Sequence, residues 1–244
     1  DNSNAGDFGD SFTTDASKKT PAFNVASVQV VNTDNGEDVT ETSLETALEE
    51  ADRDGDGDIT INDGDTVEVR LPDGTYSPGA QNTLDSNVNI ELVATSGQPT
   101  IISNNDPTLE VGSGDTSLTV DGVHFDQDDS SNTAIQTDGV SASLTVDNAV
   151  FNKSDGSGTY IDTDEDADTV EITNSLFEDQ DVDLGADSQT GILVDDGSGS
   201  TELTLTDNVF NESNIGVNLT NTPSDIDSIT VKNNEFNTNN VHVK

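Results

Sequence analysis

The sequence has no cysteine, no methionine and no tryptophan, and its 7 lysines and arginines stand against 50 aspartates and glutamates. Without cysteine there is neither a disulfide framework nor a thiolate site. The few cations are scattered, so no basic patch exists to neutralise nucleic-acid phosphates or an acidic membrane surface. No apolar run is long enough to span a bilayer. We therefore expect neither nucleic-acid binding nor membrane insertion.

The formal net charge of −43 is far larger than solubility in ordinary buffer requires. Such a surface repels itself at low ionic strength, whereas molar salt shortens the Debye length to about 3 Å. The composition therefore predicts a protein of an extreme halophile. Because the chain begins without methionine and without a signal-like segment, we expect a mature secreted or surface-displayed protein. Intrinsic disorder is the alternative for such a composition, and the ordered apolar pattern described next argues against it.

Five segments align without gaps: LTVDGVHF, LTVDNAVF, VEITNSLF, LTLTDNVF and ITVKNNEF. Their last residues are 26, 26, 33 and 26 positions apart, so the repeat is 26 residues with one insertion of seven. These residues are Phe125, Phe151, Phe177, Phe210 and Phe236. A fixed period of this length is typical of stacked repeat architectures.

Within each segment the first and third positions are apolar, which is the period-two pattern of a half-buried strand. The fifth position holds residue types that adopt a left-handed backbone at low cost, and we expect it to turn a corner. These residues are Gly122, Asn148, Asn174, Asp207 and Asn233. A second apolar cluster follows each phenylalanine, so each repeat reads as strand, corner, strand, loop and strand.

A repeat this short buries an apolar face only by stacking on its neighbours about 4.8 Å away. The sequence therefore predicts an all-β, right-handed parallel β-helix solenoid of about seven coils, with a short N-terminal capping helix over residues 42–51. An antiparallel β-sandwich is the alternative, but it would not repeat asparagine and phenylalanine at a fixed step. We divide the chain into residues 1–41, an N-terminal tail and strand available for contact between subunits, and residues 42–244, the β-helix.

The entrance to the repeats carries Asp63-Gly64-Asp65-Thr66-Val67 and Leu71-Pro72-Asp73-Gly74-Thr75-Tyr76 after the expected helix. Together with the later LTVDN-type coils, these motifs resemble the pectate-lyase-like β-helix superfamily over roughly residues 42–244. The resemblance implies the fold. It hardly constrains the activity, because that superfamily contains lyases, hydrolases, epimerases, tailspikes and adhesins.

Residues 52–63 resemble an EF-hand or dockerin calcium loop, with oxygen-bearing side chains at alternate positions and Gly57 at the sharp turn. A hard cation takes six to eight oxygen ligands, and this spacing lets alternate carboxylates converge. The predicted ligands of a structural Ca²⁺ are Asp52, Asp54, Asp56, Asp58, Thr60 and Asp63. The alternative is an ordinary Asp/Gly turn in a chain rich in such turns.

Three Asn-X-Ser/Thr sequons, at Asn152, Asn211 and Asn218, are candidate glycosylation sites of an extracellular glycoprotein. A chain rich in asparagine, serine and threonine also produces such sequons by chance.

Few residues are suited to catalysis. Two carboxylates can catalyse glycoside hydrolysis when the distance between them is suitable, so the acidic pairs Asp128-Asp129 and Asp195-Asp196 are candidates. Acidic pairs are common in this chain, however, so these two carry little weight. His124 and His242 each lie between strand residues, and we expect surface positions for both. The sequence therefore favours a protein that is not an enzyme.

The final strand-like segment, residues 241–244, has no capping segment after it, and an open coil exposes unpaired backbone groups above an apolar core. At the other end, a polar tail over residues 1–20 precedes a strand-like stretch over residues 22–31. We therefore expect a homo-oligomer joined through coil ends or through the N-terminal tail. The leading hypothesis is an extracellular structural subunit of a self-assembling filament, surface layer or virion appendage. The alternative is a glycan-binding or glycan-cleaving β-helix protein.

Overall fold

The computed structural model describes residues 27–53, 57–79, 81–103, 105–112, 114–127, 132–138, 141–153, 158–164, 167–179, 190–194, 201–211, 215–219, 226–237 and 241–243. Within these residues there is one helix, α1 (Leu44–Ala51), and the other regular elements are strands arranged in three sheets. The prediction of an all-β fold with one short helix is confirmed.

Sheet A has nine strands, in the order β2-β1-β3-β6-β9-β12-β15-β18-β21. Their bounds are β1 (Val28–Asn32), β2 (Asp38–Glu41), β3 (Thr66–Leu71), β6 (Asn89–Ala94), β9 (Ser117–Asp121), β12 (Ser143–Asp147), β15 (Thr169–Thr173), β18 (Thr201–Thr206) and β21 (Ile226–Lys232). Sheet B has seven strands: β4 (Thr75–Tyr76), β7 (Thr100–Ser103), β10 (His124–Gln127), β13 (Val150–Lys153), β16 (Leu176–Asp179), β19 (Val209–Asn211) and β22 (Glu235–Asn237). Sheet C has seven: β5 (Asn82–Leu84), β8 (Leu109–Val111), β11 (Ile135–Asp138), β14 (Thr159–Asp164), β17 (Thr190–Val194), β20 (Ile215–Leu219) and β23 (Val241–Val243).

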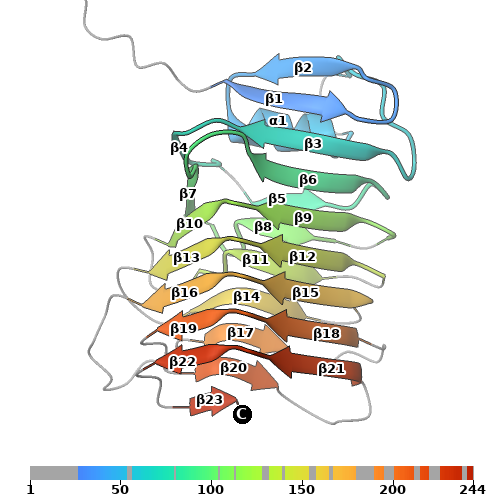
Figure 1. The fold of residues 1–244 in the computed structure, drawn as a ribbon. Coiled ribbons are helices and arrows are strands. Elements are labelled where there is room, and N and C mark those ends of the chain that lie inside the picture. Colours follow the sequence, from blue (N-terminus) through green and yellow to red (C-terminus); the bar gives the residue numbers. More distant parts are fainter. Residues whose placement is uncertain are drawn as a thin grey trace, which may run out of the picture.

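From β3 onward the chain visits sheets A, B and C in turn, and each strand pairs in parallel with the strands one coil before and after it. Seven strands of each sheet take part, which makes seven coils. In Figure 1 the chain runs leftward along sheet A in front, crosses to sheet B and returns along sheet C behind while descending, which is a right-handed coil. The parallel β-solenoid is confirmed, and at about 4.8 Å per coil it is about 33 Å long.

The repeated phenylalanines form one column inside the solenoid. Phe125, Phe151, Phe177 and Phe210 are completely buried, and each ring lies parallel to the next with centroids 4.7–5.1 Å apart. Strand register aligns them directly, since Phe125 pairs with Phe151 and Phe151 with Phe177. The seven-residue insertion between Phe177 and Phe210 therefore leaves the column in register and is accommodated outside these strands.

The corner between sheets A and B adopts the predicted left-handed backbone. The φ angles of Asn148, Asn174, Asp207 and Asn233 lie between 51° and 58°, and that of Gly122 is 72°. Asparagine and aspartate tolerate this region better than other residues with a side chain. The repeat of these residue types is therefore a repeat of one backbone turn.

A second, buried polar ladder lies one residue beyond that corner. Asn208 is completely buried, and its Nδ2 donates to the Ile172 carbonyl at 2.8 Å. Its backbone N–H donates to Asn234 Oδ1 at 3.0 Å, and its own Oδ1 accepts from the backbone N–H of Ser175 at 2.9 Å. These bonds satisfy backbone groups that the turn leaves without a strand partner. The sequence reasoning did not identify this ladder.

The N-terminal end of the solenoid is closed by α1. Ser43 is its N-cap and accepts a hydrogen bond from the Thr46 backbone N–H at 3.1 Å. The apolar face of the helix, including Leu44 and Leu48, is buried against β1, β3 and β5. The predicted capping helix is confirmed, two residues shorter than residues 42–51 because its cap is Ser43.

Strands β1 and β2 extend sheet A beyond the first coil. β1 pairs antiparallel with both β3 and β2, and its Val28 and Val30 side chains are completely buried. The described part of the proposed segment 1–41 is thus continuous with the sheet of the β-helix, while residues 1–26 lie outside the described residues. β2 forms the outer edge at this end.

Candidate functional site

The predicted calcium loop begins at a buried carboxylate that accepts hydrogen bonds from backbone groups. Asp52 follows α1 and is 1% exposed. Its Oδ1 accepts hydrogen bonds from the backbone N–H groups of Asp85 at 3.0 Å and Ser86 at 3.2 Å. Its carboxylate therefore ties the end of the capping helix to the turn that follows β5.

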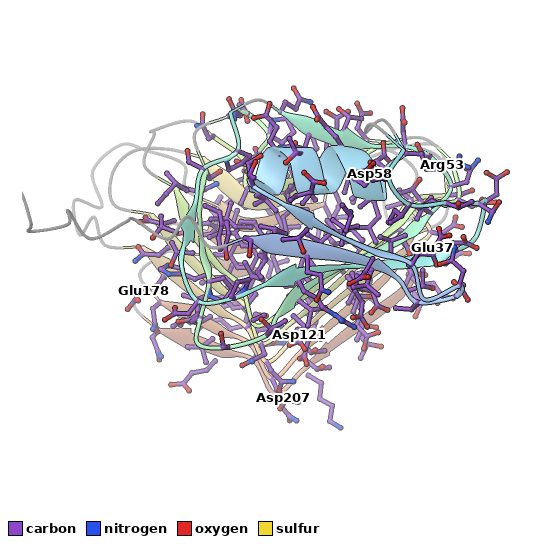
Figure 2. The ribbon with its side chains drawn as sticks, turned by 90° about the horizontal axis from the view of Figure 1, so that it is seen from above. Glu37, Arg53, Asp58, Asp121, Glu178 and Asp207 are labelled. Atoms are coloured by element: carbon purple, nitrogen blue, oxygen red, sulfur yellow. The ribbon has the colours of Figure 1, made fainter. Side chains whose placement is uncertain are left out.

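Of the remaining predicted ligands, the structure describes Asp58, Thr60 and Asp63. Asp58 and Thr60 are exposed, and Asp63 accepts from Arg53 in a 2.7 Å ion pair. Looking down the solenoid, Figure 2 shows Arg53 and Asp58 on the same side of the molecule. Asp54 and Asp56 lie outside the described residues. Within the part of the chain that the structure describes, no three histidine, aspartate or glutamate side chains form a group able to hold a metal ion.

Two carboxylates that the sequence reasoning missed organise this loop. Glu50 is 2% exposed and accepts from the backbone N–H groups of Gly57 and Ile59 at 3.2 and 3.0 Å. Asp65 accepts from the backbone N–H of Asn62 at 2.9 Å, and this bond is the main reason why the pKa of Asp65 lies below its ordinary value. Glu50 and Asp65 lie outside the loop motif at residues 52–63, so the motif could not predict their roles. Both roles depend on which backbone N–H groups lie near each carboxylate, and the sequence does not show this.

The three sequon asparagines lie on strands. Asn152, on β13, and Asn218, on β20, are half-buried, and the Oδ1 atom of each is buried and accepts no hydrogen bond from the residues that the structure describes. Asn211, on β19, accepts from Asn237 Nδ2 at 3.0 Å. The serine or threonine that completes each sequon lies outside the described residues, so glycosylation stays a prediction.

His124 lies on the outer face of sheet B and is half-buried, not fully at the surface. Its Nδ1 lies 3.3 Å from Thr100 Oγ1, while Nε2 is buried and has no hydrogen-bond partner. Burial lowers the pKa of this imidazole, against the opposing effect of the Asp126 and Glu178 carboxylates. His242 lies on β23, but its side chain is outside the described set, as are the pairs Asp128-Asp129 and Asp195-Asp196.

The lowered pKa of His124 predicts a pH effect on stability. The unfolded chain takes up this proton near the ordinary pKa of 6.5, whereas the folded protein takes it up only at lower pH. The folded state is therefore fully favoured above 6.5 and loses this contribution as the pH falls below that value. In molar salt, the thermal midpoint of the wild type should fall relative to that of His124→Asn between about pH 7 and pH 5. Since His242 is present in both proteins, parallel pH profiles would contradict the assignment.

The last coil differs from the others in exposing its core-type side chains. Ile229 and Val231 on β21 are 49% and 44% exposed. Register aligns them with Leu203 and Leu205 of the preceding coil, which are 1% and 0% exposed. Phe236 on β22 stacks on Phe210 at 4.8 Å and is half-buried. The two exposed residues occupy the same columns as the core, and they differ only because no described coil covers them.

Comparison of the chain with known protein families, with curated proteins and with solved structures finds no match. The resemblance to pectate-lyase-like proteins therefore remains a prediction about family, while the parallel β-solenoid itself is observed. Among the described residues, no helix is long and apolar enough to cross a membrane.

Proposed function

We propose that this chain is an extracellular structural subunit of a self-assembling filament, surface layer or virion appendage that operates at high salt. The observation that carries the proposal is the last coil, where Ile229 and Val231 occupy core columns yet are about half exposed. Exposed, aligned apolar side chains beside open strand edges are a template for another chain.

The opposite end of the solenoid supports the same interpretation. There α1 and β1 cover the interior, and the first coil's apolar residues, such as Val67 and Val69, are completely buried. Among the described residues, one end of the solenoid is thus covered and the last coil is not, as expected for a subunit that joins a partner at a defined end.

The acidic surface supports operation in concentrated salt. Like charges lie side by side on neighbouring strands of sheet A, where Glu68 pairs with Glu91 and Asp121 with Asp147. In the described residues, the ion pairs are Arg53 with Asp63 and Arg70 with Glu68. Screening by dissolved cations is therefore the main available means of reducing this repulsion.

We further propose that Ca²⁺ binds the loop at residues 52–63 and stabilises the capped end. Gly57 has a φ of 81°, which suits the sharp turn of such a loop. Glu50 and Asp65 hold the loop backbone from either side. Asp63 accepts from Arg53 with Oδ1, so a Ca²⁺ bound by the same carboxylate would weaken this ion pair.

The test is the state of association of the full 244-residue chain in molar salt with millimolar calcium. Light scattering after size exclusion should give a mass above the 25.5 kDa of one chain, and negative-stain electron microscopy should show regular particles. Monomers at every concentration would contradict the proposal. Saturable binding of a polysaccharide by such monomers would favour the glycan-binding alternative.

A chelator separates the calcium proposal from the assembly proposal. Loss of the particles on chelation, with recovery when calcium is restored, is the expected result. Particles that persist unchanged, with an unchanged thermal midpoint, would remove the role of calcium and leave the assembly proposal standing.

A further inference from the structure

We propose that two copies of this chain join tail to tail, stacking their last coils about a twofold axis so that β21 of one copy pairs antiparallel with β21 of the other. This inference rests on the proposed self-association and names the interface, the partner and the symmetry. A twofold contact closes after two copies, so the dimer is the unit from which a larger assembly is built. The partner is a second copy of the same chain.

The apolar surface of the last coil matches what a stacked coil would bury. Ile229 and Val231 lie in register with Leu203 and Leu205, which the stacking of β21 on β18 buries. Another layer of similar side chains at the same spacing would bury the exposed pair in the same way. A second last coil presents such side chains, since it is the same surface.

The charge of the last coil permits contact between two copies of a highly acidic protein. The described residues of this coil, 226–237 and 241–243, contain two acids, Asp227 and Glu235, and one cation, Lys232, so their formal net charge is −1. The rest of the chain therefore carries −42 of the formal net charge of −43. Contact between copies elsewhere would bring many like charges together, whereas the local repulsion at this coil is small.

The closed end is a poor partner for this surface. Residues 34–52 contain eight acids and no lysine or arginine. The apolar side chains there, including Leu48, are buried beneath the polar face of α1. A head-to-tail contact would cover Ile229 and Val231 with acidic, hydrated groups, whereas a tail-to-tail contact covers them with each other.

Backbone geometry favours the same pairing. β21 is the outermost strand of sheet A at this end and is seven residues long. No described strand pairs with its outer edge, which therefore presents backbone N–H and C=O groups. A twofold axis perpendicular to β21 places the two edges antiparallel, and such an axis makes the contact self-complementary. Sheet A then continues from one copy into the other.

The interface is tested by charge insertion in the full chain at molar salt. The double variant Ile229→Lys, Val231→Lys should weaken dimerisation at least ten-fold by sedimentation equilibrium. Thr230→Lys is the matched control, because Thr230 lies between them on the same strand, is exposed and points to the outer face. It should weaken dimerisation far less than the double variant does, because its lysine stays in solvent and does not enter the apolar contact. The mutated side chains are already half exposed, so the circular dichroism spectrum of the double variant should stay unchanged.

The symmetry is tested with single cysteines, which the cysteine-free chain makes unambiguous. Thr230→Cys should cross-link to itself through a short bis-maleimide. Thr40→Cys, on the exposed edge strand β2, should link neither to itself nor to Thr230→Cys in a mixture. Links formed only in the mixture would overturn the twofold pairing in favour of head-to-tail stacking.

The remaining outcomes separate this inference from the proposed function. If the wild type associates and the double variant associates equally well, the interface is elsewhere and the inference fails while the proposed function stands. If the wild type never associates, both fail.

Discussion

Replacing Phe177 with alanine is expected to lower the free energy of unfolding by about 3–5 kcal/mol. Phe177 is completely buried, and its ring lies between those of Phe151 at 4.9 Å and Phe210 at 4.7 Å. Alanine removes both stacking contacts and leaves a cavity between two coils that depend on each other for burial. For a chain of this size the thermal midpoint should fall by about 10–15 °C. Urea and thermal unfolding in molar salt measure both quantities.

Two further variants isolate the cause of this loss. Phe177→Leu keeps most of the volume and loses the ring stacking, so it should cost about 1–2 kcal/mol. Phe236→Ala removes a half-buried ring of the same column at the last coil, and it should cost less than Phe177→Ala. Equal losses for Phe236→Ala and Phe177→Ala would show that the column does not act as a stacked core.

The coil architecture was predictable because the solenoid repeats one turn and one aromatic position. The spacing of phenylalanines fixes the strand register, and the observed pairs Phe125 with Phe151 and Phe177 with Phe210 follow it. The recurring asparagine or aspartate predicts the corner, and the φ of 52° at Asn148 bears this out. Both signals are local, so neither needs knowledge of what lies across the core.

The polar interior was not predictable in the same way. Asp207 and Asn208 are neighbours of similar polarity, yet Asp207 is exposed and Asn208 completely buried. The difference arises from which one faces the solenoid interior after the turn, where Asn208 binds the Ile172 carbonyl of the preceding coil. Glu50 is a similar case. From the sequence, an acid near a helix end is expected to be solvent-exposed, and only the structure shows that it accepts hydrogen bonds from backbone N–H groups of the loop.

The candidate sites show the same difference between features that spacing predicts and features that depend on partners distant in the sequence. Spacing alone places Asp52 and Asp63 in one loop, but Asp52 binds the N–H groups of the turn after β5, and Asp63 binds Arg53. The partners of Asp52 come from a distant part of the chain, and the partner of Asp63 is an arginine. A loop motif records only the spacing of possible ligands, so it predicts neither kind of partner. The exposure of Ile229 and Val231, by contrast, follows from the repeat itself, because a coil that no described coil covers presents the columns that its neighbours bury.

Dilution from molar salt to about 0.1 M at neutral pH is expected to destabilise the fold by roughly 5–10 kcal/mol, which is comparable to the whole stability of a typical domain. Two carboxylates about 10 Å apart in water repel by about 0.4 kcal/mol before screening. Debye lengths of about 10 Å at 0.1 M and about 3 Å at 1 M reduce this to about 0.15 and about 0.01 kcal/mol.

These small terms become large because the chain has 50 acidic residues and few cations to offset them. With about four acidic neighbours each, they form roughly 100 pairs, and the repulsion at 0.1 M is about 15 kcal/mol before that of the unfolded chain is subtracted. Circular dichroism during stepwise dilution should therefore show cooperative loss of β structure. The protein should refold when salt is restored.

Dilution at low pH distinguishes charge repulsion from the general salting-out effect that strengthens apolar burial. Near the sequence pI of 4.1 the positive and negative charges balance, so removing salt has little repulsion to uncover. If repulsion is the cause, the loss of stability on dilution should shrink several-fold at that pH. If salting-out is the cause, dilution should destabilise the protein equally at both pH values, and sulfate should protect far better than chloride at equal ionic strength. Retention of the fold at 0.1 M salt and neutral pH would contradict both explanations, and with them the argument that the charge of −43 is an adaptation to brine.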